Sequence, residues 1–427
     1  MDIKAILADM QNCPCGHEHT FDTEAVEIGS GLTAKTGELL AAAGFGKRLM
    51  LVADKAELEA AQGVIPALES SGFVLKKLIY DNLIYARSEG VAEVEALCGD
   101  VDGVISVGTG SCNDICRVAA FRADKDYAIF ATAPSMDGFA SDSAPIIDGC
   151  FKTSITARQP KIIIADTKIL AAAPAELKSA GFGDMVAKYI ALVDWNIARL
   201  VGDDYYCERI AGLVSDAIKR ITSLCDRITE GDEESAGAVM EALVLTGLAM
   251  KLSGNSRPAS GCEHVVSHFW ECTKLTRGIW PEFHGKKVGV ATVLVNRMYH
   301  MIALENPTIE PTREQLDWDD IRRAYGPQLV DGMMAVNRPT VTDRIDPARL
   351  KAAWPEIRRM ILEFMPTDEQ LCDMMRRAGA AITPEEVHVD PQLLYDGLKY
   401  HSFMRYRITL TRLIPMMNIN FDYRRVK

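Results

Sequence analysis

The sequence predicts two domains, an open α/β sheet in residues 1–168 and an all-helical domain in residues 169–427. Up to residue 166, short runs of branched apolar residues alternate with amphipathic segments, which is typical of strands and helices in a parallel sheet. From Pro174 onward the apolar residues recur at helical spacing, and no further strand pattern follows. A chain of 427 residues has room for two or three domains of ~150 residues each.

The strands of the first domain are predicted from their composition and from the residues that end them. Leu49–Ala53 is a continuous apolar run that stops at Asp54, as a strand buried on both faces does. The predicted strands are Ala25–Gly31, Leu49–Ala53, Phe73–Ile79, Gly103–Val107, Tyr127–Thr132 and Lys161–Asp166. The helices between them are predicted at Leu32–Ala43, Glu57–Ser71, Val91–Cys98 and Asn113–Phe121.

The second domain is predicted to open with a helix over Met185–Leu200, directly after the sequence Gly-Phe-Gly-Asp184. Two glycines this close favour a turn, so we expect Asp184 near the amino end of the helix, where a carboxylate can cap free N–H groups. The further predicted helices are Tyr206–Ile228, Ser235–Leu252, Glu263–Thr273, Lys287–Leu304, Arg313–Ala324, Pro347–Met365, Asp368–Ala378, Pro391–Tyr400 and Tyr406–Met416.

The overall composition excludes several classes of partner. A net charge of −12 argues against nucleic acid or an anionic membrane, although a local basic pocket for a phosphorylated small molecule is compatible with it. The sequence has no run of eighteen apolar residues and no signal peptide at its start, so we expect no membrane insertion. Eleven cysteines without the spacing of a disulfide scaffold favour reduced thiols and a cytoplasmic location.

Three of the eight histidines lie between Ser260 and Gly285. His264 and His268 are four residues apart and therefore share one face of a helix, and His284 follows sixteen residues later. Neutral imidazole is a common ligand of divalent metals, so the group predicts a metal site, with Asp184 as a candidate carboxylate partner. The alternative is two surface histidines and an unrelated third, which the Gly, Ser and Cys residues around them make less favourable.

A glycine turn follows the predicted strand Gly103–Val107 and reads Gly108-Thr-Gly-Ser-Cys-Asn-Asp114. Glycines let the backbone approach a pyrophosphate, and the first N–H groups of the next helix then face the anion. The third glycine of the usual fingerprint is missing, but the order strand, turn, helix favours a dinucleotide. A dinucleotide beside a Lewis-acid metal predicts a metal-dependent, NAD(P)-linked alcohol or ketone oxidoreductase with its site between the domains.

A second group of soft ligands lies near the start of the chain, in Cys13-Pro-Cys15-Gly-His17-Glu-His19. These residues could hold zinc, but the spacing is not that of a standard zinc knuckle and the cluster completes no tetrahedral site. We therefore treat residues 1–24 as an extension in which a plain surface loop is favoured over a structural metal.

Taken together, the motifs resemble the superfamily of iron-containing alcohol dehydrogenases, glycerol dehydrogenases and dehydroquinate synthases. The resemblance covers about residues 25 to 415 in motif order. Its most specific part is Ser256-Arg-Pro-Ala-Ser-Gly-Cys-Glu-His264-Val-Val-Ser-His268, which is most similar to the sn-glycerol-1-phosphate dehydrogenase group, particularly its bacterial type. It implies a Rossmann-like nucleotide-binding domain followed by a helical metal-binding domain of the dehydroquinate synthase type.

The resemblance also implies roles for individual residues. Asp184, His264 and His284 are implied as metal ligands, and Asp137, Asp184 and His268 as catalytic and substrate-contacting residues. The implied cofactor contacts are Asp54, Gly108, Gly110, Ser111, Cys112, Asn113, Asp114, Thr132, Ala133, Pro134, Ser135 and Ser141. A carboxylate at Asp54 would accept the adenosine ribose hydroxyls and repel a 2′-phosphate, so NAD is expected ahead of NADP.

The implied reaction is the reduction of dihydroxyacetone phosphate, a phosphorylated triose, to sn-glycerol 1-phosphate by NADH or NADPH. His268, or a water that it positions, is expected to supply the proton. Mixed Asp/His/His ligation accommodates zinc, nickel or iron. The alternatives are a polyol dehydrogenase for an unphosphorylated substrate and a non-catalytic relative that binds nucleotide or metal. We expect a homodimer, and Arg257 and Lys188 are candidates for the phosphate contact.

Overall fold

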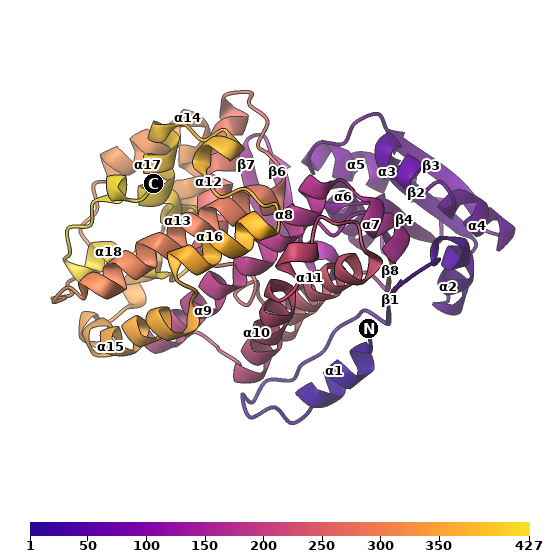
Figure 1. Cartoon of the computed structure of the whole chain (residues 1–427). Coiled ribbons are helices and arrows are strands. Elements are labelled where there is room, and N and C mark those ends of the chain that lie inside the picture. Colours follow the sequence, from indigo (N-terminus) through magenta and orange to yellow (C-terminus); the bar gives the residue numbers. More distant parts are fainter.

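The computed structural model describes residues 1–427 and confirms the predicted fold class (Figure 1). A six-stranded sheet with its helices forms one half of the molecule, and a cluster of helices forms the other. All six strands are parallel, in the order β1-β8-β5-β4-β2-β3. They are β1 (Ala25–Gly29), β2 (Arg48–Asp54), β3 (Val74–Tyr80), β4 (Gly103–Gly108), β5 (Asp126–Ala131) and β8 (Ile162–Asp166).

The sheet is buried in its centre and partly exposed at its edge. Every residue of β4 and of β8 is buried, because helices cover both faces of a parallel sheet. Strand β3 lies at the edge and has no fully buried residue. The helices of this half are α2 (Thr36–Ala42), α3 (Lys55–Ala60), α4 (Val64–Ser70), α5 (Ser88–Leu97) and α6 (Gly110–Arg122). The single helix expected over Glu57–Ser71 is thus divided into two.

Two elements of this region were not predicted. The first is α1 (Ile3–Met10), in the segment that precedes the sheet. The second is an antiparallel hairpin of β6 (Ser143–Asp148) and β7 (Phe151–Thr156), which turns at Gly149. Strand β6 packs against α6, whereas β7 contacts α12 and α14 of the helical half, so the hairpin bridges the two halves (Figure 1).

The second half is entirely helical after β8. Its helices are α7 (Thr167–Ala172), α8 (Ala175–Val186), α9 (Lys188–Gly202), α10 (Glu208–Thr222), α11 (Glu233–Ser253), α12 (Cys262–Thr276), α13 (His284–Glu305), α14 (Trp318–Val336), α15 (Pro347–Phe364), α16 (Asp368–Arg377), α17 (Pro391–Tyr400) and α18 (Leu410–Met417). By length and composition alone α11 could cross a membrane, but 78% of its most apolar window is buried inside the protein. Strand β8 leads directly into α7, so the domain boundary at residue 168 stays a prediction.

The expected turn before Asp184 was wrong, because Gly181-Phe-Gly-Asp184 lies inside α8, close to its carboxyl end. The glycines are there for packing. A Cβ atom added to Gly181 would lie 1.9 Å from the carbonyl oxygen of Pro134, and one added to Gly183 would lie 2.7 Å from that of Gly285. Such distances are far inside van der Waals contact, so only glycine lets α8 pack this closely.

The same close approach is visible from the other helix. A Cβ atom added to Gly285, in the first turn of α13, would lie 2.0 Å from the carbonyl oxygen of Ala180 in α8. The two helices therefore touch backbone to backbone. This contact places Asp184 of α8 beside His284, the first residue of α13.

Replacement of Gly285 by alanine is expected to lower the free energy of unfolding by about 1–3 kcal/mol, because the new methyl group forces α8 and α13 apart. Gly212→Ala is the matched control, since Gly212 is exposed on α10 and nothing lies within 4 Å of its added Cβ. That change is expected to be neutral or to stabilise by up to about 1 kcal/mol. Urea denaturation of the metal-free proteins measures both, and equal stability of the two variants would contradict the packing argument.

Candidate active site

Asp184, His264 and His284 come from three different helices and converge on one point. Their candidate ligand atoms all lie within 4.8 Å of one another. Nε2 of His264 is 3.3 Å from Oδ1 of Asp184, and Nε2 of His284 is 4.0 Å from Oδ2 of the same carboxylate. The structure thus brings together the three residues that the resemblance implied as metal ligands.

The second ring nitrogen of each histidine determines which nitrogen is free to bind. Nδ1 of His264 lies 2.6 Å from Oε1 of the buried Glu263, and a carboxylate only accepts hydrogen bonds. Nδ1 therefore carries a proton. Burial opposes a charge on the ring, but the hydrogen bonds to Asp184 and Glu263 raise the pKa of His264 above its ordinary value. Nε2 faces Asp184 and becomes a ligand atom once its proton is released, as in other metal sites. Nδ1 of His284 is buried without a partner, and burial holds the pKa of His284 well below its ordinary value. That imidazole is neutral at pH 7, as a metal ligand must be.

Asp184 is held as a carboxylate by the charges around it. Burial alone would favour its neutral form, but Lys188 and the two histidines keep the pKa of Asp184 well below its ordinary value. Nζ of Lys188 lies 3.0 Å from Oδ1 of Asp184 and 2.5 Å from Oδ2 of Asp137. The backbone N–H of Asp137 also donates to Oδ2 of Asp184 at 2.9 Å. These contacts fix the loop after β5 to the ligand cluster.

Neither candidate for the phosphate contact lines the cavity. Lys188 is completely buried between Asp137 and Asp184, so its charge is already neutralised. Arg257 forms an ion pair with Asp204 and donates to the carbonyl oxygen of Ile408. Closeness in the sequence to the site motifs was therefore a poor guide to a phosphate-binding side chain.

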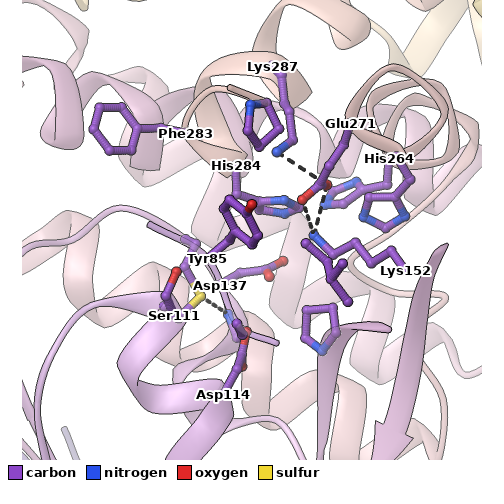
Figure 2. A pocket seen from close by; sticks show the side chains of 18 of the residues that line it. Tyr85, Ser111, Asp114, Asp137, Lys152, His264, Glu271, Phe283, His284 and Lys287 are labelled. Carbon is purple, nitrogen blue, oxygen red and sulfur yellow. Dashed lines mark hydrogen bonds and ion pairs between the residues drawn. The ribbon is translucent and has the colours of Figure 1, made fainter. Parts of the chain in front are cut away.

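A cavity of about 190 Å³ opens beside the three ligands, and both halves of the molecule line it (Figure 2). His268 lies on its wall, with its ring centroid 6.3 Å from that of His264 and 5.9 Å from that of His284. Burial, together with the positive charge of Lys152, holds the pKa of His268 well below its ordinary value, so the ring is neutral at pH 7. Its Nδ1 is buried without a partner in the protein.

Three charged residues of the cavity were missed from the sequence. Nζ of Lys152 is 2.9 Å, and Nζ of Lys287 is 3.2 Å, from Oε2 of Glu271 (Figure 2). Burial opposes the charge of Glu271, but the two lysines lower its pKa to about 2. Burial also lowers the pKa of Lys287 to about 8. Because two ammonium groups share one carboxylate, this cluster carries an excess of positive charge beside His268.

Helical spacing was a usable signal for two of these residues. Glu271 follows His268 by three positions on α12, and Lys287 follows His284 by three positions on α13, so each shares a helix face with a site histidine. Lys152 gave no such signal, because it reaches the cavity from the hairpin strand β7.

The residues implied as cofactor contacts fall into two groups. Those that line the cavity are Gly110, Ser111, Asp114, Ser135 and Ser141. Those that do not line it are Asp54, Gly108, Cys112, Asn113, Thr132, Ala133 and Pro134. Within the second group, the Cys112 thiol donates to the carbonyl oxygen of Val52, and Oδ1 of Asn113 accepts from the Tyr127 hydroxyl. These two side chains lie between α6 and the sheet, although their backbones stay in the first turns of α6.

Asp54 and Glu57 shape the edge of the sheet near the glycine turn. The carboxylate of Asp54 accepts the backbone N–H of Ala56 at 2.8 Å and that of Leu83 at 2.7 Å. Oε1 of Glu57 accepts both the N–H and the hydroxyl of Thr109 at 2.7 Å. A Cβ atom added to Gly108 would lie 2.1 Å from the Glu57 carboxylate, which explains the glycine at that turn.

Replacement of His264 by alanine is expected to abolish metal binding at the Asp184/His264/His284 cluster, because it removes one of three ligands and leaves the Asp184 carboxylate without its closest imidazole. His300→Ala is the matched control, since His300 lies toward the other end of α13 and bonds only the carbonyl oxygen of Asn296. Elemental analysis after reloading with Zn²⁺ or Ni²⁺ measures the loss. Unchanged metal content in His264→Ala would rule out the cluster as a metal site.

The chain is similar to known proteins of one enzyme family. Residues 27–174 match the family model described as iron-containing alcohol dehydrogenase. The glycerol-1-phosphate dehydrogenase [NAD(P)+] of Geobacillus stearothermophilus is 30% identical over 425 residues, which are 98% of this chain and 98% of that protein. The enzyme of the same name from Geobacillus thermodenitrificans is 33% identical over 75% of this chain and 72% of its own length.

A solved structure shares the fold at low sequence identity. The glycerol dehydrogenase of Schizosaccharomyces pombe superposes with a TM-score of 0.63 at 16% identity, over 96% of this chain and 89% of that one. Identity at this level supports the fold alone, whereas the full-length match to the Geobacillus stearothermophilus enzyme establishes the family. The chain belongs to the glycerol-1-phosphate dehydrogenases, within the iron-containing alcohol dehydrogenase family.

Proposed function

We propose that this chain is an NAD(P)-dependent oxidoreductase that reduces dihydroxyacetone phosphate to sn-glycerol 1-phosphate. The observation that carries the proposal is the arrangement of one cavity, with the Asp184/His264/His284 cluster on one side and the Lys152–Glu271–Lys287 cluster on another. The names of the two Geobacillus relatives support the same reaction.

The ligand cluster fits a divalent metal by its chemistry. One carboxylate and two neutral imidazoles form the donor set of a catalytic Zn²⁺, Ni²⁺ or Fe²⁺ site, and the cavity leaves room for a substrate oxygen beside them. When bound, such a cation polarises the carbonyl group while a reduced nicotinamide supplies the hydride. Glu263 orients the His264 imidazole, and Lys188 offsets one of the two negative charges of Asp137 and Asp184.

The lysine cluster is our proposed phosphate contact. Lys152 and Lys287 each direct an ammonium group at Glu271, and together they exceed its charge by one. Ammonium groups donate three hydrogen bonds each, so both retain donors for the oxygens of a phosphate. A substrate with its carbonyl near the ligand cluster and its phosphate near the lysines would place its reacting carbon next to His268.

His268 is our proposed proton-handling residue. Its neutral ring lines the cavity, so it can hydrogen-bond the substrate hydroxyl and pass a proton to the reduced oxygen. Because the imidazole is neutral, we expect it to relay a proton and not to stabilise negative charge as a permanent cation. Asp137, which also lines the cavity, is held by Lys188 and is proposed to contact the substrate.

For the cofactor, we propose that NAD is preferred to NADP. Asp54 ends β2 at the carboxyl edge of the sheet, and its carboxylate orders the backbone at Leu83, next to cavity residues Ile84 and Tyr85. A negative charge at this edge disfavours a ribose 2′-phosphate. The ratio of kcat/KM for NADH to that for NADPH tests this preference and is expected to be greater than one.

Replacement of Lys152 by methionine is expected to raise KM for dihydroxyacetone phosphate roughly 10- to 100-fold, because a charge-assisted hydrogen bond contributes about 1.5–3 kcal/mol. Turnover of unphosphorylated dihydroxyacetone should change little. Lys219→Met is the matched control, since Lys219 is exposed on α10, pairs with Asp216 and lies outside the cavity. If the wild-type enzyme used both substrates equally well, a polyol dehydrogenase would be the better assignment.

Replacement of His268 by alanine is expected to lower kcat by about 10²- to 10⁴-fold, the usual contribution of a positioned proton-transfer group. Metal content should remain at the wild-type level, in contrast to His264→Ala, because His268 is not among the clustered ligand atoms. Steady-state kinetics, together with elemental analysis of the same samples, separates the two roles. Loss of metal in His268→Ala would make His268 a ligand instead.

A further inference from the structure

A second cluster of soft donors lies outside the cavity, at Cys13, Cys15, His19 and Cys207. The candidate ligand atoms of these four residues all lie within 4.8 Å of one another. The sulfur of Cys13 is 3.5 Å from that of Cys207, and Nε2 of His19 is 3.2 Å from the sulfur of Cys15 and 3.8 Å from that of Cys207. Cys207 stands directly before α10, far along the chain from the other three.

The orientation of His19 is independent support for a ligand role. Its Nδ1 lies 2.8 Å from the carbonyl oxygen of Leu252, at the end of α11. A carbonyl oxygen only accepts, so Nδ1 carries the proton and the lone pair of Nε2 faces the sulfur atoms. A backbone carbonyl on the second nitrogen is the usual way in which proteins orient a metal-binding histidine.

The surroundings also fit a closed site. Residues 11–24 form the expected loop and most of them are exposed, but Cys13 and His19 turn inward and are buried, as Cys207 is. Cys13 and Cys207 belong to an apolar cluster that includes Trp195, and the Tyr205 hydroxyl donates to the sulfur of Cys15 at 3.4 Å. A disulfide would use only two of the cysteines and would not account for the third cysteine or for the orientation of His19. A single cation uses all four donors.

We propose that Cys13, Cys15, His19 and Cys207 bind a structural Zn²⁺ ion, separate from the metal of the active site. Three thiolates and one imidazole complete a tetrahedral shell and leave no open position, which is the pattern of structural zinc sites. Soft sulfur ligands favour zinc over hard cations such as Mg²⁺. Binding is a ligand exchange without oxidation, in which each thiol that binds the cation releases its proton to solvent.

The proposed site explains how the first 24 residues are attached. Figure 1 shows this segment, in indigo, running beside α10 and away from the sheet edge. The four ligands join it to the start of α10 through Cys207 and to the end of α11 through the His19–Leu252 hydrogen bond. Arg209 of α10 adds a hydrogen bond to the carbonyl oxygen of Asp9 at 2.6 Å. The zinc ion would thus attach residues 1–24 to the helical half.

Cobalt substitution tests the proposal on the full-length protein. The active-site donors contain no sulfur, so a thiolate-to-cobalt charge-transfer band cannot come from the active site, and its loss on replacement of Cys15 and Cys207 assigns it to the N-terminal cluster. After removal of metal and reloading with Co²⁺, we expect this band in the wild-type protein and in His264→Ala, and its loss in Cys15→Ser/Cys207→Ser. Cys98→Ser is the matched control, because Cys98 is buried elsewhere and bonds only the carbonyl oxygen of Val94.

Zinc counting completes the experiment. The wild-type protein loaded with Zn²⁺ should hold one more ion per chain than either His264→Ala or the double cysteine variant, and the double variant should melt at a lower temperature than Cys98→Ser. If the double variant does not fold, the wild-type and His264→Ala spectra still decide. Absence of the charge-transfer band in both, or a thiol titration in denaturant that finds nine of the eleven cysteines free, would overturn the proposal in favour of no site or of a disulfide.

Discussion

The backbone contact between α8 and α13 is the constraint on which the active site depends. Gly183 of α8 and Gly285 of α13 have no side chains that would separate these helices, so their backbones lie in direct contact. Asp184 near the end of α8 and His284 at the start of α13 are thereby placed side by side. His264 reaches the same point from the first turn of α12, so the ligand cluster exists only while these three helices keep their packing.

The charges around the cavity are separated in a way that matches a triose phosphate. On one side, the three buried carboxylates of Asp137, Asp184 and Glu263 outnumber the single ammonium group of Lys188, which favours a metal cation. On the other side, Lys152 and Lys287 exceed Glu271 by one positive charge, which favours an anion. Both clusters are buried, so water screens them poorly and their fields act over the short distance that a three-carbon substrate spans. The acidic charge of the whole chain does not enter this local balance.

Sequence patterns predicted those features that local spacing determines. The apolar runs gave all six strands of the main sheet, and the histidine spacing placed His264 and His268 on one helix face. Gly-Phe-Gly before Asp184 was misread as a turn, because the carbonyl groups that require those glycines come from Pro134 and Gly285, which are distant in the sequence. Lys152 was missed for the same reason, since its hairpin is defined by packing against both halves and not by an apolar pattern.

The N-terminal cluster is likewise completed by a residue that is distant in the sequence. Cys13, Cys15 and His19 are an incomplete set in the sequence, and only the fold supplies Cys207 as the fourth donor. The two donor sets differ in softness and therefore prefer different metals. One oxygen and two nitrogens beside a cavity accept zinc, nickel or iron and leave an open position for substrate, whereas three sulfurs and one nitrogen form a closed shell that favours zinc. On this proposal, an enzyme active with nickel or iron at the first site still carries zinc at the second, so total metal content and catalytic metal are different quantities in this protein.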